Sequence, residues 1–543
     1  MRPFAGAAAL GLSLIGLLGG CSQPSATPGL SANYQAVPTQ GNTVPSGARQ
    51  PAMPGEALSL AAPSPSSSRF PFQFGPAPVD RESYAAVEEN PYFSVANEPL
   101  STFSIDVDTA SYANVRRLLQ NGLRVPPGAV RIEEMVNYFD YRYPEPEGEV
   151  PFSVSAETAS CPWMPQHRLM RIGLRGRPMP KRNLPPANLV FLIDVSGSMS
   201  DANKLPLVKS SLRLLLDELD PKDRVALVVY AGTSGLVLDS TPVSERRRIL
   251  DALEGLEAGG STAGAEGIQL AYQVASKHQG PGVNSRVILA TDGDFNVGIT
   301  DESQLERLIK DRARSGVYFT VLGYGMGNYQ DDRLELLADK GNGNYAYVDT
   351  LQEARKVLVR EMGSTLLTIA KDVKIQVEFN PAQAAAYRLI GYENRKLEHQ
   401  DFHDDKKDAG EIGADHTVTA YYEIVPAGQA APGLKMDALK YSRPPEAAAA
   451  AESGELATIK LRYKPPQETA SKLITHVVRD KGETFEQSSR DFQFGASVAA
   501  FGMLLRDSQH KGNTTFGRIR EWARAGQTDD PHGDRAEFLA LLQ

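Results

Sequence analysis

Strand-like apolar runs alternate with helical patterns through the middle of this sequence, and this alternation most constrains the fold. The runs occupy residues 189–193, 224–230, 286–291, 317–322 and 345–348. Helical patterns follow them around residues 205–219, 249–253, 267–276, 305–313 and 351–367. A strand that is apolar throughout is buried on both faces, and strands that alternate with helices form parallel sheets. We therefore expect an α/β domain with a doubly wound, mostly parallel sheet.

Shorter segments on either side of this region alternate between apolar and polar residues, as strands of an antiparallel sheet do. Such segments are 101–108, 152–156 and 169–174 before the α/β region, and 373–379, 417–424 and 457–463 after it. We expect them to form one antiparallel β-sandwich with flanking helices, into which the α/β domain is inserted. A separate C-terminal sheet is the alternative.

Two acidic pairs accompany the first helices. Glu133 and Glu134 lie beside an apolar stripe in residues 132–139, and we expect them to face solvent. Asp106 and Asp108 precede the first helix, where they could bind a cation or act as acid and base. Because no third ligand lies nearby in the sequence, we expect capping and solvation instead.

The N-terminus has the pattern of an export signal. Residues 4–20 carry no charge, and their apolar run is shorter than a membrane-spanning helix requires. The end of this run, Leu-Gly-Gly-Cys21, resembles the bacterial lipobox, which implies that Cys21 is acylated and tethers the protein to a membrane. Ser22 resembles a signal for the outer membrane. The alternatives are an uncleaved anchor helix or an ordinary signal peptide.

The stretch after Cys21 cannot build a core. It holds 11 of the 37 prolines, and Arg49 and Glu56 are its only charges before Arg69. The second cysteine, Cys161, is expected to be a small buried hydrophobe.

The predicted organisation has six parts. They are a lipoprotein signal peptide at 1–20, a disordered tether at 21–80, a helical and β segment at 81–185, the α/β domain at 186–367, a β-rich segment at 368–475 that completes the sandwich, and a helical tail at 476–543. We expect the tail to dock on the earlier helices.

Polar residues follow two of the apolar runs at the point where each strand is expected to end. Asp194 comes directly after the run at 189–193, and Asp292 comes after the run at 286–291. In an open α/β sheet, ligands bind outside the carboxyl ends of the strands. Ser196 and Ser198 alternate with Asp194, so the three side chains can face one point.

These side chains offer hard oxygen ligands. Carboxylate and hydroxyl oxygens without thiolate or imidazole suit Mg²⁺, Mn²⁺ or Ca²⁺ and disfavour zinc. A loop at 259–264 lies between the two aspartates in the sequence and adds further hydroxyl groups. The sequence therefore predicts a divalent metal site.

At these residues the sequence resembles the von Willebrand factor type A domain, whose metal-ion-dependent adhesion site has the pattern Asp-x-Ser-x-Ser, a distant Thr and a distant Asp. The matching residues are Asp194, Ser196, Ser198, Thr262 and Asp292. The resemblance covers residues 188–367. The surrounding sequence looks like the bacterial YfbK-type lipoproteins, and its layout is similar to that of the inter-alpha-trypsin inhibitor heavy chains.

The resemblance implies a mechanism of binding. The hydroxyls ligate the metal directly and the aspartates act largely through water, so the ion keeps positive character and an open position. A carboxylate of an Asp or Glu on a partner protein can fill that position. The resemblance thus implies a membrane-tethered, metal-dependent protein-binding or adhesion lipoprotein of the cell envelope, at the outer membrane and facing the periplasm or the cell surface. The alternative is a structural or assembly factor of the envelope in which the metal only holds the loops.

Other function classes fit the sequence poorly. The net charge of −9 gives no electrostatic reason to expect nucleic acid as a partner. Ser196 and Ser198 do not lie in a Gly-x-Ser-x-Gly motif, and no histidine is near them in the sequence. We therefore expect that the chain is not an enzyme.

Overall fold

The computed structural model describes residues 82–180, 183–260, 264–293, 302–326, 329–361, 367–407, 409–434 and 453–543. All of them belong to one unit of the chain, Phe74–Gln543. The predicted signal peptide, most of the predicted tether, Cys21 and Thr262 lie outside the described residues. In the part of the chain that is described, no helix is long and apolar enough to cross a membrane.

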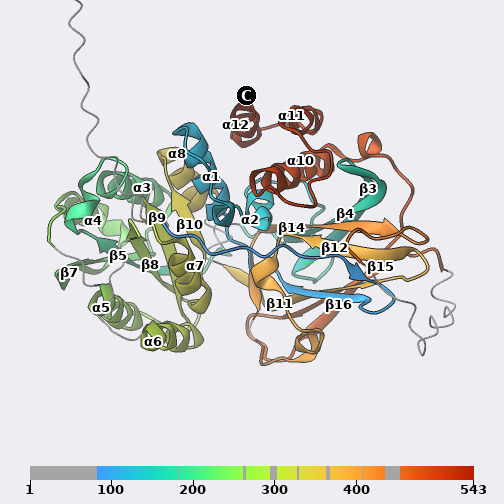
Figure 1. The fold of residues 1–543 in the computed structure, drawn as a ribbon. Coiled ribbons are helices and arrows are strands. Elements are labelled where there is room, and N and C mark those ends of the chain that lie inside the picture. Colours follow the sequence, from blue (N-terminus) through green and yellow to red (C-terminus); the bar gives the residue numbers. More distant parts are fainter. Residues whose placement is uncertain are drawn as a thin grey trace, which may run out of the picture. The chain divides into compact units, whose positions relative to one another are not determined.

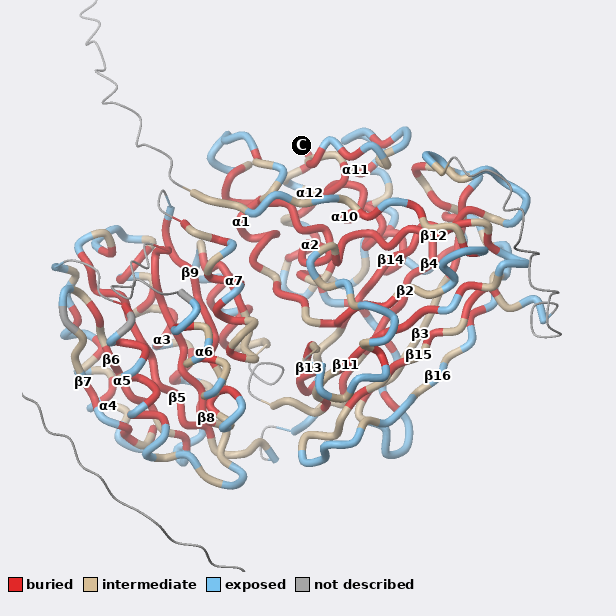
Figure 2. Tube along the Cα trace, turned by 60° about the horizontal axis from the view of Figure 1, so that its bottom comes forward, coloured by how far each residue is buried: buried red, intermediate tan, exposed pale blue. Residues whose placement is uncertain are grey.

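The central domain is built on a six-stranded sheet with the order β10-β9-β8-β5-β6-β7. All neighbours are parallel except β7, which pairs antiparallel with β6. The prediction of a mostly parallel sheet is confirmed, and Figure 2 shows its central strands buried along most of their length. The strands are β5 (Ala187–Asp194), β6 (Arg224–Ala231), β7 (Thr233–Pro242), β8 (Asn284–Thr291), β9 (Val317–Tyr324) and β10 (Tyr345–Val348).

Helices cover both faces of this sheet (Figure 1). Apolar side chains of α3 (Leu205–Glu218), α4 (Arg246–Glu254) and α8 (Leu351–Arg355) pack on one face. The other face packs against α5 (Gly264–Ser276), α6 (Glu302–Arg314) and α7 (Asp331–Lys340). The helix expected at 351–367 is shorter than predicted, because α8 passes at Lys356 into a π-helical turn that ends at Arg360.

Two antiparallel sheets form the second part of the fold. One has the order β1-β12-β14-β4-β3, and the other has the order β13-β11-β15-β16 with β2 also paired to β11. Their strands are β1 (Phe93–Ser94), β2 (Leu100–Ser104), β3 (Phe152–Cys161), β4 (Met164–Gly176), β11 (Thr368–Phe379), β12 (Ala384–Ile390), β13 (Gly410–Gly413), β14 (Thr417–Pro426), β15 (Ala457–Lys464) and β16 (Lys472–Val478).

In these sheets, strands that precede the α/β domain in the sequence pair with strands that follow it. β4 pairs with β14, and β2 pairs with β11. Apolar side chains of the two sheets share one core that includes Ile172, Ile375 and Tyr422. The inserted sandwich is therefore confirmed, and the alternative of a separate C-terminal sheet is wrong.

The helical tail packs on the earlier helices, as expected. Side chains of α10 (Arg490–Leu505), α11 (Phe516–Ala525) and α12 (Asp534–Leu541) share a core with α1 (Ala110–Gln120) and α2 (Ile132–Asn137). A Cβ at Gly502 would lie 2.8 Å from the side chain of Ile132, so only glycine allows α10 to approach α2 this closely. Cys161 is fully buried in the same core, and the expectation of a small buried hydrophobe is confirmed.

The acidic residues of α2 do not face solvent. Glu133 is 4% exposed and Glu134 is 2% exposed. Arg131 forms ion pairs with Glu134 and with Asp331 of α7, while Glu134 also accepts a hydrogen bond of 2.9 Å from the Ser111 N–H. The sequence-based expectation was wrong because the polar side of α2 packs near α7 of the α/β domain.

Asp106 and Asp108 are likewise engaged with the rest of the fold. Arg395, in the segment after β12, lies 3.4 Å from a carboxylate oxygen of each, and 3.1 Å from one of Glu335 on α7. Asp108 also accepts a hydrogen bond of 2.7 Å from the Tyr345 N–H. The expectation of capping and solvation was therefore wrong for Asp108, which is buried beside an arginine from the sandwich, whereas Asp106 is partly exposed next to the same arginine.

These groups form one buried ion network, which we call the arginine clasp. Burial raises the pKa of Glu134 and of Asp339 to about 6 and also raises the pKa values of Asp108 and Glu335. Carboxylate oxygens of Asp108, Glu134 and Glu335 come within 4.8 Å of one another, but the two arginines already neutralise them. The clasp consists of Arg131, Arg395, Asp106, Asp108, Glu134, Asp331, Glu335 and Asp339.

Replacement of Arg131 tests the clasp. Arg131→Met leaves buried carboxylates without their counter-ion, so we expect a loss of about 3–5 kcal/mol in the free energy of unfolding. Arg248→Met is the matched control, because Arg248 forms an exposed ion pair with Glu245 that contributes less than about 1 kcal/mol. Urea unfolding measures both values. Equal losses in the two variants would contradict this account.

Candidate metal centre

Two of the predicted metal ligands lie at neighbouring strand ends. Asp194 is the last residue of β5, and Asp292 directly follows β8. These strands are parallel neighbours in the centre of the sheet, and the chain leaves β5 toward β6 on the opposite side. The site is thus at the carboxyl edge of the sheet, where the strand order reverses. Both aspartates are fully buried.

The Asp194 carboxylate organises the turn that follows it. One oxygen accepts a hydrogen bond of 2.8 Å from the Ser196 N–H, and the other accepts bonds from Tyr230 Oη at 3.1 Å and Thr291 Oγ1 at 3.4 Å. Burial raises the pKa of Asp194 to about 6, and the nearby Asp292 adds to the rise. The two carboxylates are therefore close enough for the charge of Asp292 to disfavour ionisation of Asp194.

The serines of the motif are brought together by the same turn. Ser196 Oγ and Ser198 Oγ are 3.0 Å apart, at the beginning of the short helix η3 (Gly197–Ser200). Four of the five predicted ligands thus lie in the described part of the site, and Thr262 lies outside it. The donor set consists of hydroxyl and carboxylate oxygens, which fits a hard divalent cation. Ser196, Ser198, Asp194 and Asp292 would hold the ion, which would supply positive charge at the carboxyl edge of the sheet.

The sequence did not predict Tyr230 and Thr291, which donate to Asp194, or the lysine of this site, Lys204. Its buried Nζ donates a hydrogen bond of 2.9 Å to Asp292 Oδ2 and one of 3.0 Å to the carbonyl oxygen of Ser198. The lysine therefore ties the serine turn to the second aspartate. A lysine at the N-terminal end of a helix opposes the helix dipole, and this was the available signal that Lys204 has another role.

The path of the Lys204 side chain is fixed by Gly325. A Cβ at Gly325 would lie 2.4 Å from Lys204 Cε, and the residue has a φ of +78°. Only glycine therefore fits at this position. The ammonium group neutralises Asp292 when no metal is bound.

The serines show no sign of nucleophile activation. Within the described part of the chain, no histidine is hydrogen-bonded to Ser196 or Ser198, and the two hydroxyls contact each other. A hydrolytic serine needs a neighbouring base. Both hydroxyls instead belong to the oxygen donor set that fits a divalent cation.

Replacement of Lys204 should separate its effects on metal and on fold. In Lys204→Met the repulsion between ammonium and metal disappears and Asp292 is released, so we expect about tenfold tighter Mn²⁺ binding, or about 1.4 kcal/mol. Without metal, the buried Asp292 loses its counter-ion and the melting temperature should fall.

Titration calorimetry and thermal unfolding measure the two effects. Lys209→Met, on α3, is the matched control, because this ammonium donates to the carbonyl oxygen of Glu254 and, among the described residues, to no group of the metal centre. Unchanged or weaker Mn²⁺ binding in Lys204→Met, compared with this control, would contradict the expectation.

Three family models match consecutive parts of the chain. The model of the von Willebrand factor type A domain matches residues 188–360, and a model described as von Willebrand factor matches residues 78–171. The model of the C-terminal region of YfbK matches residues 364–543. The type A match covers the α/β domain with its metal motif.

Known proteins are similar to the chain over different lengths. Inter-alpha-trypsin inhibitor heavy chain H1 of Sus scrofa is 28% identical over 199 residues, which are 35% of this chain and 22% of that protein. A solved von Willebrand factor type A structure from Catenulispora acidiphila is 15% identical with a TM-score of 0.37, covering 72% of this chain and 96% of that chain. YfbK of Escherichia coli is 44% identical over 467 residues, which are 85% of this chain and 80% of that protein. The chain therefore belongs to the YfbK family, and its residues 188–360 form a von Willebrand factor type A domain.

Proposed function

We propose that this protein binds a partner protein through a divalent metal at the carboxyl edge of the α/β sheet, and that the metal docks a carboxylate of the partner. The observation that carries the proposal is the serine turn, in which two hydroxyls lie 3.0 Å apart beside two buried aspartates. Metal-dependent protein interaction is common among type A domains, and this supports the proposal.

The charge balance of the site favours docking of an anion. Lys204 already neutralises Asp292. A bound divalent ion would therefore keep more of its positive charge than it would beside two aspartates without a counter-ion. A partner's Asp or Glu supplies the missing negative charge. The oxygen donors favour Mg²⁺, Mn²⁺ or Ca²⁺ as the ion.

The alternative is a structural metal that only holds the loops in an envelope assembly factor. Such a metal should be needed for the fold, whereas Lys204 ties the serine turn to Asp292 without it. Even at 100 times its dissociation constant, a metal adds only about 2.7 kcal/mol of stability. The lysine bridge therefore supports the binding role over the structural one.

Matched peptides test the open metal position. In the Mn²⁺-loaded protein, water-proton relaxation should fall when a peptide with one Asp displaces water from the ion, and the same peptide with Asn should have no effect. Ser196→Ala should weaken Mn²⁺ binding at least about tenfold, which is about 1.4 kcal/mol. Ser200→Ala, an exposed residue of the same turn, should not.

Two outcomes would count against docking. Equal responses to the Asp and Asn peptides would show that the metal does not select a carboxylate. A large fall in the melting temperature of Ser196→Ala, with unchanged peptide binding, would favour the structural metal.

We also propose that the protein is anchored in the cell envelope by acylation of Cys21, on the outer membrane. The support is the uncharged apolar run that ends at this cysteine. A palmitate analogue should label the wild-type chain and the Cys161→Ala variant, because Cys161 is buried, but it should not label Cys21→Ala. Labelling of Cys21→Ala at the wild-type level would refute the anchor.

A further inference from the structure

A cleft of about 850 Å³ lies between the α/β domain and the sandwich, at the opposite end of the sheet from the metal centre. Arg286, near the start of β8, lines it, whereas Asp292 follows the end of the same strand. Nine Lys and Arg residues line the cleft against four Asp and Glu residues. This excess of positive charge contrasts with the net charge of −9 for the whole chain.

Arg286 is the deepest of these cations and is only 2% exposed. Its Nη1 donates a hydrogen bond of 2.6 Å to Thr320 Oγ1, and its guanidinium lies 5.4 Å from the ring centroid of Tyr318. Burial lowers the pKa of Arg286 to about 10, so the group is still charged at neutral pH. A buried arginine in a polar cleft is the kind of group that holds phosphate or carboxylate.

Four lysines at the cleft are available to a ligand from both sides. Lys310 and Lys340 come from α6 and α7 of the α/β domain, whereas Lys396 and Lys406 come from the segment between β12 and β13 of the sandwich. Among the described residues, these four lysines form no ion pairs. Several positive charges in one cleft reinforce each other's electrostatic field and attract anions.

The described acidic residues of the cleft form no ion pairs with these lysines. Asp106 and Asp339 pair with Arg395, and Asp372 pairs with Lys464. Glu411 accepts a hydrogen bond of 2.9 Å from Thr368 Oγ1, and burial raises its pKa to about 7. The positive charge of the four lysines is therefore left for a ligand.

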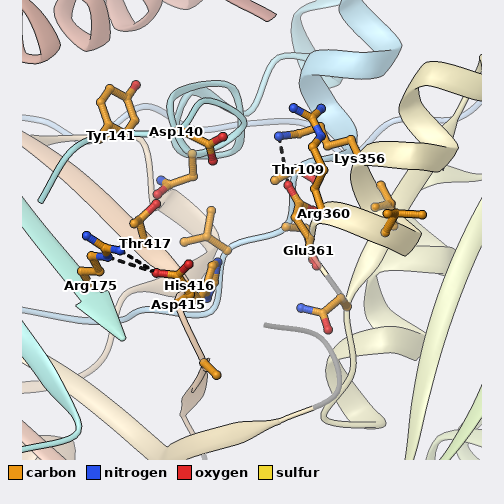
Figure 3. Close-up of a pocket in the computed structure, with 18 of the residues that line it drawn as sticks. Thr109, Asp140, Tyr141, Arg175, Lys356, Arg360, Glu361, Asp415, His416 and Thr417 are labelled. Carbon is orange, nitrogen blue, oxygen red and sulfur yellow. Dashed lines mark hydrogen bonds and ion pairs between the residues drawn. The ribbon is translucent and has the colours of Figure 1, made fainter. Parts of the chain in front are cut away.

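A neighbouring cavity of about 780 Å³ provides a contrast (Figure 3). Its basic residues are paired, with Lys356 at 2.9 Å from Glu361 and Arg175 at 3.0 Å from Asp415. Arg360 pairs with Asp534 at 2.9 Å. Proximity to the junction of the two domains therefore does not by itself create a basic surface.

We propose that the basic cleft binds a compact anion that carries two or more phosphate or carboxylate groups. Lysines on both walls suit a ligand with several charged groups, and the buried guanidinium of Arg286 can meet one of them with charge-assisted hydrogen bonds. The volume limits the ligand to a small molecule or a single headgroup. This binding site is separate from the metal centre and does not depend on it.

Calorimetry of the full-length chain with inorganic tripolyphosphate and with citrate tests the proposal. We expect binding of at least one of these probes, with an affinity that falls as salt concentration rises. The double variant Lys310→Glu/Lys406→Glu should bind at least tenfold more weakly. Lys481→Glu/Arg518→Glu, which reverses two exposed charges outside the cleft, should bind as the wild type does.

Several results would overturn the proposal. One is the absence of binding of either probe at millimolar concentration, and another is an equal loss of binding in the two double variants. Vesicles with 30% phosphatidylglycerol separate a free anion from a lipid surface. Cleft-dependent binding to these vesicles without binding of either soluble probe would refute a compact soluble ligand in favour of a membrane surface.

Discussion

Two buried arginines join the α/β domain to the sandwich, and the basic cleft between these domains depends on the arrangement that they favour. Arg131 reaches from the start of α2 to Asp331 on α7, and Arg395 reaches from the sandwich to Glu335 on the same helix. Burial of so many charges is costly unless each finds a partner. The clasp therefore favours one arrangement of the two domains, because another arrangement would leave buried carboxylates without counter-ions.

The central sheet separates two regions of opposite chemistry. At its carboxyl edge, Asp194 and Asp292 concentrate negative charge, and Lys204 offsets part of it. At its amino edge, Arg286 and the lysines of α6 and α7 face basic residues of the sandwich. The proposed metal and the proposed anion would thus each supply the charge that its end of the sheet lacks.

Lysine and arginine have different roles in these regions. Lys204 extends a flexible stem past Gly325 and places a point charge between the serine turn and Asp292. Arg131 and Arg395 instead use planar guanidinium groups to contact several carboxylates at once. This difference follows from the geometry of the two side chains, and an exchange of one for the other would not preserve either contact.

The sequence predicted much of the fold and most of the side chains that the structure brings together at the candidate metal centre. Long apolar runs identified β5 and β8, because a strand that is buried on both faces cannot alternate with polar residues. Period-two segments on both sides of them identified the sandwich. Strand β7 was missed because it is an edge strand, on which Leu236 and Val237 are exposed.

The helices, the long strands and the metal motif could be predicted without coordinates, because hydrophobic periodicity and the spacing of Asp194, Ser196 and Ser198 are local properties. Which charged side chains are buried could not be predicted, because their burial depends on how distant segments pack. The sequence predicted that Glu134 is solvated on an amphipathic helix, yet it is buried in the clasp. Its partner Arg131 also pairs with Asp331, which lies 200 residues further along the chain. The contacts of Lys204 and the clustering of basic residues in the cleft could not be predicted for the same reason. Charged side chains interact when they are close in space. The distances between charges of the α/β domain and those of the sandwich are set only when the two domains pack together.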